Sequence, residues 1–94
     1  MNKDVEKILT KNFGDKKGVN ISKAKYDQVK NMIMDKMKKQ DTITMSELSE
    51  YVKSQLKNFD GKVGWYFMAV KLDLEVKNLI ERVPNKLPQT LRLK

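Results

Sequence analysis

Residues 63–94 read VGWYFMAVKLDLEVKN, LIERVP, NKLP and QTLRLK, with breaks after residues 78, 84 and 88. The first piece repeats apolar residues at helical spacing, and Asn78 stands where a helix commonly ends in the left-handed conformation. The second and fourth pieces are short apolar runs separated by a proline-bounded turn, which is typical of paired strands. In the fourth piece, Thr90 and Arg92 alternate with leucines, so we expect one solvent-exposed face and one buried face. This segment predicts a helix followed by a β-hairpin.

Two further helices are predicted before this segment. The first should begin at Ser22, a good N-cap, and its apolar residues recur at spacings of three, four and four, namely at Tyr26, Val29, Ile33 and Met37. The second begins with a capping box, in which Thr44 caps forward and Glu47 reaches back. The short run 42–44 is expected to pair with the C-terminal hairpin. Asp60 is a candidate cap for the third helix.

Residues 1–21 are predicted to form an N-terminal arm that precedes a domain of residues 22–94. Within the arm, Asp4 to Leu9 could make a short helix, with Val5, Ile8 and Leu9 on one side. The following NFGDKKGVN, in which two glycines bracket Lys16 and Lys17, favours a loop or an extended segment.

The exit from the third helix carries the most specific resemblance in the chain. The run LEVKNLIER (74–82) resembles the connection between recognition helix and wing in many bacterial winged helix-turn-helix repressors, with Asn78 where those proteins usually have Gly. The resemblance covers residues 22–94, and the leader NFGDKKGVNISKAKYD is also similar to a family of small uncharacterised bacterial winged-helix proteins. It implies an α+β, mostly α, three-helix winged helix-turn-helix domain with a C-terminal β-hairpin wing and an N-terminal extension. It also implies DNA binding as the commonest function.

The third helix departs from a usual recognition helix. Alignment on the exit run assigns the core stripe to Val63, Phe67, Val70 and Leu74. The positions that would face a DNA groove then hold mostly apolar side chains, namely Trp65, Tyr66, Met68, Ala69, Leu72 and Asp73. The helical periodicity independently predicts a second apolar stripe through Trp65, Ala69, Leu72, Val76 and Leu79. Apolar side chains read little of a base pair beyond the thymine methyl group. This helix is therefore poorly suited to base readout.

A helix that is apolar on two faces is normally covered on both. Three kinds of cover are compatible with this sequence. The first is the N-terminal arm, through Val5, Ile8, Leu9 and Phe13. The second is another copy of the chain, and the third is a different protein. The predicted interaction face therefore comprises Trp65, Met68, Ala69, Leu72 and Val76.

The net charge of +8, from twenty basic and twelve acidic residues, is compatible with an anionic partner such as double-stranded DNA. Only Arg82 and Arg92 are arginines, and lysine-rich surfaces also serve solubility, so the charge permits DNA binding without identifying it. Contacts to the phosphate backbone would fall to the candidate residues Lys16, Lys17, Lys62, Tyr66, Lys86 and Arg92. Such contacts supply affinity but little sequence information.

Composition argues against an enzyme. The chain has no cysteine and no histidine, which removes thiol chemistry, the usual general base and the commonest metal ligand. No Gly-rich phosphate loop, metal site or cofactor motif is recognisable. The apolar runs are too short for a membrane span or a signal peptide, so we expect a cytoplasmic protein. Two functions remain: a regulator-like DNA-binding protein, or a protein-interaction or dimerisation module that uses the same scaffold without reading DNA.

Overall fold

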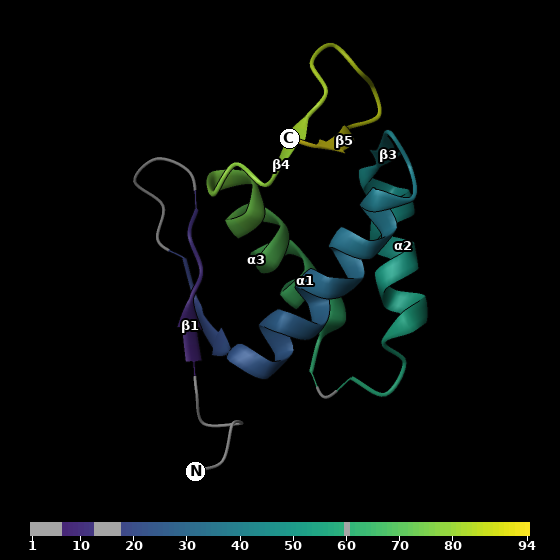
Figure 1. The fold of residues 1–94 in the computed structure, drawn as a ribbon. Helices are drawn as coiled ribbons and strands as arrows, with labels where there is room; N and C mark the ends of the chain where they lie inside the picture. The colour runs from purple at the N-terminus through teal and green to yellow at the C-terminus, as the bar shows by residue number, and fades with distance from the viewer. Residues whose placement is uncertain (1–6, 13–17, 60) are drawn as a thin grey trace.

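The computed structural model describes residues 7–12, 18–59 and 61–94. It is an α+β structure of three helices and two small antiparallel sheets within the described residues (Figure 1). The helices are α1 (Lys23–Lys38), α2 (Met45–Gln55) and α3 (Val63–Val76). The strands are β1 (Lys7–Leu9), β2 (Asn20–Ser22), β3 (Ile43–Thr44), β4 (Ile80–Arg82) and β5 (Thr90–Leu93). The coarse class expected from the sequence is therefore observed.

Both predicted helix starts are confirmed. Ser22 is the N-cap of α1, where its side chain accepts a hydrogen bond from the backbone N–H of Lys25. At α2, Thr44 and Glu47 form the complete capping box, with each side chain bonded to the backbone of the other. These bonds satisfy N–H groups that have no partner within the first turn of a helix.

The core is formed where the three helices meet the larger sheet. The four predicted residues of α1 are all buried, and they pack with α2 through Leu48 and Val52. From α3, the buried apolar residues are Phe67, Val70 and Leu74, whereas the predicted core residue Val63 is only partly buried. The sheet contributes Ile43, Ile80 and Leu91, each of which is almost fully enclosed.

Strand β5 is the centre of the larger sheet, whose order is β3-β5-β4. The short run before α2 pairs with it as expected, with Ile43 opposite Leu91 and Thr44 opposite Thr90. On the other side, Arg82 of β4 lies opposite Leu91. The prediction that Thr90 lies on a solvent-exposed face is wrong. Thr90 is buried because β3 covers this end of β5, and the Thr90 hydroxyl donates a hydrogen bond to the carbonyl of Pro88 at 3.0 Å. Arg92 is exposed as predicted.

The predicted short helix at Asp4–Leu9 is also wrong for the residues that the structure describes. Residues 7–9 form β1, which pairs with β2 through Ile8 opposite Ile21, and the backbone of Thr10 continues the pairing by donating to Val19 at 2.9 Å. A helix of six residues is too short to be stable alone, whereas pairing with β2 gives the backbone partners and directs Ile8 toward the core. The candidate residues Val5, Phe13, Lys16 and Lys17, and the candidate cap Asp60, lie outside the described residues.

The exit from α3 behaves as the sequence predicts. Asn78 has a φ of +63°, and the N–H of Leu79 donates back to the carbonyl of Leu74 at 3.0 Å. This is the left-handed turn that ends many helices, and glycine and asparagine adopt it most readily. It redirects the chain from α3 into β4.

We therefore expect Asn78→Ala to lower the free energy of unfolding by about 1 kcal/mol, because a Cβ without a compensating polar group is strained at positive φ. Asn78→Gly is the matched control and should retain the wild-type value to within roughly 0.5 kcal/mol. Urea denaturation followed by circular dichroism measures both. Equal losses in the two variants would contradict the conformational explanation and point instead to the bond between Lys94 and the Asn78 side chain.

Candidate functional site

Helix α3 carries most of the candidate residues singled out in the sequence. It packs against α1 and α2 and leads into β4, and the β1–β2 hairpin stands beside it (Figure 1). Its polar and apolar side chains divide among three environments. One polar cluster faces the hairpin, a second faces the sheet, and an apolar face remains partly open.

The first polar cluster surrounds Asp73, whose side chain is fully buried. The hydroxyl of Tyr26 in α1 donates a hydrogen bond to Asp73 Oδ2. The ammonium of Lys77 lies 2.8 Å from the same oxygen. Oδ1 accepts the backbone N–H of Lys11, just after β1, at 2.7 Å. One carboxylate thus joins α1, α3 and the N-terminal hairpin. Asp73 was predicted to face a DNA groove, and this prediction is wrong because the hairpin covers it.

These contacts set the ionisation of the cluster. Burial by itself raises the pKa of Asp73, but the hydrogen bonds from Lys77, Tyr26 and the Lys11 backbone outweigh it and hold that pKa below its ordinary value of 3.8. Burial, followed by the bond to the Asp73 carboxylate, raises the pKa of Tyr26. Asp73 is therefore ionised and Tyr26 neutral at physiological pH.

The second polar cluster surrounds Glu75. The ammonium of Lys71, itself almost fully buried, lies 2.5 Å from Glu75 Oε1 and 3.3 Å from the side-chain oxygen of Gln89. Arg82 of β4 donates from Nε to Glu75 Oε2 at 3.0 Å. In the sequence, Lys71 and Glu75 are separated by four residues and lie on the same helix, α3. Their burial could not be read from the sequence, because an i,i+4 Lys–Glu pair is more often exposed on a helix surface.

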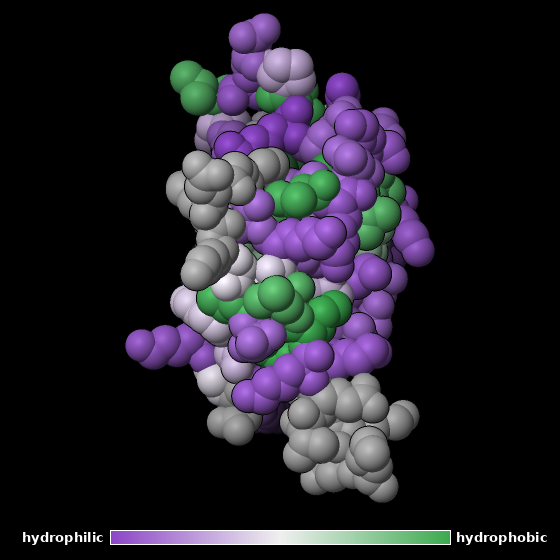
Figure 2. All heavy atoms as spheres, turned by 90° about the vertical axis from the view of Figure 1, so that its left-hand side faces the viewer, coloured by the Kyte–Doolittle hydropathy of each residue, from purple (hydrophilic) through white to green (hydrophobic). Residues whose placement is uncertain are grey.

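The open part of α3 carries the predicted interaction face. Trp65 is 48% exposed and Met68 42% exposed, whereas Ala69, Leu72 and Val76 are partly buried. A pocket of about 170 Å³ lies between this face and the hairpin, lined on the helix side by Trp65, Met68, Ala69 and Leu72. Seen from the side that carries β1, apolar atoms form separate patches with hydrophilic atoms between them (Figure 2).

The described residues of the N-terminal arm line this pocket without filling it. Its second wall includes Lys11 and Val19 of the hairpin. The N-terminal residues were one of the three possible covers for the apolar face; of these, Ile8 instead packs against the core, and Leu9 is 63% exposed. The hairpin is therefore a neighbour of the interaction face, and among the described residues it leaves Trp65 and Met68 accessible.

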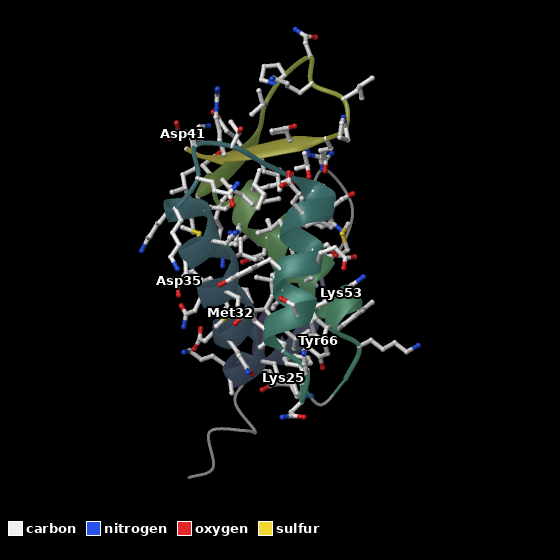
Figure 3. The ribbon with its side chains drawn as sticks, turned by 90° about the vertical axis from the view of Figure 1, so that its right-hand side faces the viewer. Lys25, Met32, Asp35, Asp41, Lys53 and Tyr66 are labelled. Carbon is white, nitrogen blue, oxygen red and sulfur yellow. The ribbon has the colours of Figure 1, made fainter. Side chains whose placement is uncertain are left out.

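The predicted phosphate contacts are distributed over two ends of the molecule. Lys62 is exposed and is the N-cap residue of α3, but its side chain makes no capping hydrogen bond, and the first turn of α3 holds no acidic residue. Tyr66 is partly buried there, with Lys25 of α1 lying 5.2 Å from its ring centre and Phe59 packed edge-on to it (Figure 3). Lys86 is exposed on the loop between β4 and β5. The structure therefore does not bring Lys62 and Lys86 into one cluster.

Arg92 differs from the two exposed lysines. It projects from β5 and donates from Nε to Glu81 of β4 at 2.5 Å, so its charge is already matched across the strand pair. A phosphate contact would have to replace this partner. Within residues 7–12, 18–59 and 61–94, no group of His, Cys, Asp or Glu side chains is arranged to hold a metal ion.

The chain belongs to a family of unknown function, DUF6958, whose model matches residues 7–91. The match includes the β1–β2 hairpin as well as the helices, so the hairpin is part of the family's domain. No curated protein and no solved structure matches the chain. None of the described helices is long and apolar enough to cross a membrane.

Replacing the buried carboxylate tests the first cluster. Asp73→Asn should lower the free energy of unfolding at pH 7 by roughly 3 kcal/mol, because it leaves the Lys77 ammonium without its ion-pair partner and weakens the tie to the hairpin. Since the folded-state pKa of Asp73 is depressed, its contribution is present above pH 3.8 and is lost as pH falls through the folded value. Denaturation curves at several pH values should thus converge for wild type and variant in acid. A gap that persists at the lowest pH would contradict the ionic explanation.

The second cluster makes a different prediction. Lys71→Met alone should be strongly destabilising, by about 3 kcal/mol, because Glu75 stays buried with only Arg82 to neutralise it. The double change Lys71→Met with Glu75→Met should cost less than either single change, since both buried charges are then removed together. A double-mutant cycle by urea denaturation measures this. Additive losses would show that the two side chains do not depend on each other.

Proposed function

We propose that this chain is a winged helix-turn-helix protein that binds duplex DNA, mainly through the phosphate backbone. The order of elements supports the fold assignment: three helices are followed by the β4–β5 hairpin, and β3, just before α2, pairs with β5. In this assignment α3 corresponds to the recognition helix. The loop of residues 83–89, which extends away from the helices in Figure 1, corresponds to the wing.

The observation that carries the proposal is the pairing of both acidic residues of α3 inside the fold. Asp73 is matched by Lys77, and Glu75 by Lys71 and Arg82. Neither carboxylate therefore faces an approaching phosphate. Residues 83–94 contain no acidic residue at all. Among the described residues, α3 with its N-cap Lys62 and the 83–89 loop thus present lysine without an exposed competing carboxylate. The net charge of +8 attracts a polyanion over a longer range.

The same helix supports binding with little sequence preference. Its outward side chains near the N-terminus are Trp65 and Met68, which offer no hydrogen-bond pattern matched to a base edge beyond the single indole N–H. Lys62 and Lys86 are exposed and suited to phosphate contacts. The amide groups of the first turn of α3, which the Lys62 side chain does not cap, add partial positive charge. We therefore place the affinity in the backbone contacts. The proposed protein is non-catalytic and needs no cofactor or metal; we further propose that it works in the cytoplasm.

Salt dependence of binding tests this function. Affinity for a random-sequence duplex, measured by fluorescence anisotropy, should fall with salt at a logarithmic slope of about −0.9 per phosphate neutralised. Lys62→Gln and Lys86→Gln should each reduce the steepness of that slope by about 1. Lys38→Gln, on the exposed last turn of α1, is the matched control because it removes the same charge at another site.

Two results would contradict this proposal, the first by rejecting DNA binding and the second by rejecting the proposed contact sites. The first is the absence of binding at low salt, where a cationic domain has its greatest electrostatic advantage. The second is an equal loss of affinity in all three variants, which would indicate a response to net charge alone instead of contacts at α3 and the 83–89 loop.

A second function is a protein-interaction or dimerisation module on the same scaffold without DNA readout. The exposure of Trp65 and Met68 on one helix face favours it, because such side chains together in water commonly mark an interaction site. Sedimentation analysis of the sample used for DNA binding separates the two functions. A stable dimer without DNA affinity would favour the second.

A further inference from the structure

The pocket between α3 and the N-terminal hairpin has features of a binding site for one apolar side chain. Its volume of about 170 Å³ is comparable with a cavity of roughly 150 Å³ that holds a benzene molecule. Trp65, Met68 and Leu72 project from successive turns of α3, so they form a continuous apolar wall. Val19 adds apolar surface on the hairpin side.

Among the described residues that line this pocket, the only charge is positive. None of the described residues that line it is acidic, and Lys11 stands on its hairpin wall. Asp73 and Glu75, the acids of α3, are buried in the two polar clusters and do not reach the pocket. Lys7 is exposed on the same hairpin. An occupant that combines an apolar anchor with negative charge would therefore match both the surface and the field around it.

We propose that this pocket, which is lined by Trp65, Met68 and Leu72, docks an acidic amphipathic segment of a partner protein. One large apolar side chain of that segment fills the pocket, and Met68 and Trp65 close around it. The segment's carboxylates lie toward Lys11 and the neighbouring hairpin. An anchor side chain in a pocket, surrounded by weaker polar contacts, is the usual distribution of energy in such interfaces.

Charge favours an acidic segment over the two other possible occupants of the pocket, a second copy of the chain and a DNA duplex. In a symmetric dimer, the same lysines of two copies would be brought toward one another, and that like-charge contact opposes association. A DNA duplex satisfies the lysines but leaves the apolar wall of α3 against a polar groove. An acidic amphipathic segment satisfies both. The proposal does not depend on DNA binding, because its test contains no DNA.

Trp65 makes the test direct, since it is the only tryptophan of the chain and lies on the pocket. The probe is a synthetic amphipathic helical peptide with leucine and phenylalanine on one face and glutamate on the other. Titration into the full chain should shift the Trp65 emission to shorter wavelength, with half-saturation in the micromolar range. A peptide with lysine in place of glutamate, and a peptide of the same acidic composition with its apolar face scrambled, should each bind at least about tenfold more weakly.

Two variants locate the site. Met68→Glu adds a carboxylate at the pocket on a side chain that is already 42% exposed, and it should weaken the acidic peptide by at least about tenfold. Leu87→Glu makes the same change at a residue that is 97% exposed on the 83–89 loop, and it should leave peptide affinity within about twofold. Thermal unfolding of both variants checks that the fold is retained.

Several outcomes would overturn the proposal. Equal binding of the scrambled acidic peptide would mean that attraction is only electrostatic, and no spectral shift up to millimolar peptide would mean that the pocket is not a docking site. Equal weakening by Met68→Glu and Leu87→Glu would place binding elsewhere. A shift that grows with protein concentration alone would assign the face to a second copy of the chain.

Discussion

The buried carboxylate of Asp73 is the interaction on which the arrangement of this protein depends. It receives the Tyr26 hydroxyl from α1, the Lys77 ammonium from α3 and the backbone N–H of Lys11 from the N-terminal hairpin. A charge removed from water is tolerated only when its partners replace the lost hydration. Each of these partners must therefore hold its place, and the hairpin is fixed relative to the helices as a consequence.

A second consequence concerns the surface. Asp73 and Glu75 are each paired with basic side chains inside the molecule, on the hairpin side and the sheet side of α3 respectively. What α3 leaves toward solvent is then apolar, with exposed lysines at Lys62 and on the hairpin beside it. The proposed phosphate contacts and the proposed docking of an acidic segment both rest on this separation of charge. The two proposed surfaces meet near Trp65 at the start of α3: the phosphate contacts involve Lys62 and the 83–89 loop, and the docked segment occupies the pocket between Trp65 and the hairpin.

Much of the local structure could be predicted because its causes are local. The Ser22 cap, the Thr44–Glu47 capping box and the left-handed Asn78 each depend on groups within a few residues of one another. The apolar stripe of α1 follows from helical periodicity and is buried throughout. The leader was predicted incorrectly because Ile8 and Leu9 fit a short helix or a strand equally well, and only pairing with β2 distinguishes the two.

The sequence by itself determined the helices, the C-terminal hairpin, the two apolar stripes of α3 and the excess of positive charge. Only the tertiary structure decided which charges meet solvent. In the sequence, Lys71 and Glu75 resemble an exposed helical pair, and Asp73 resembles a surface acid. In the fold, Gln89 contacts Lys71 and Arg82 contacts Glu75. Tyr26 and Lys11 contact Asp73 from other elements. The physical reason is that burial depends on segments distant in the chain, whereas capping, turns and periodicity depend on near neighbours. For the same reason, the pocket between hairpin and helix has no signature in the sequence of either element.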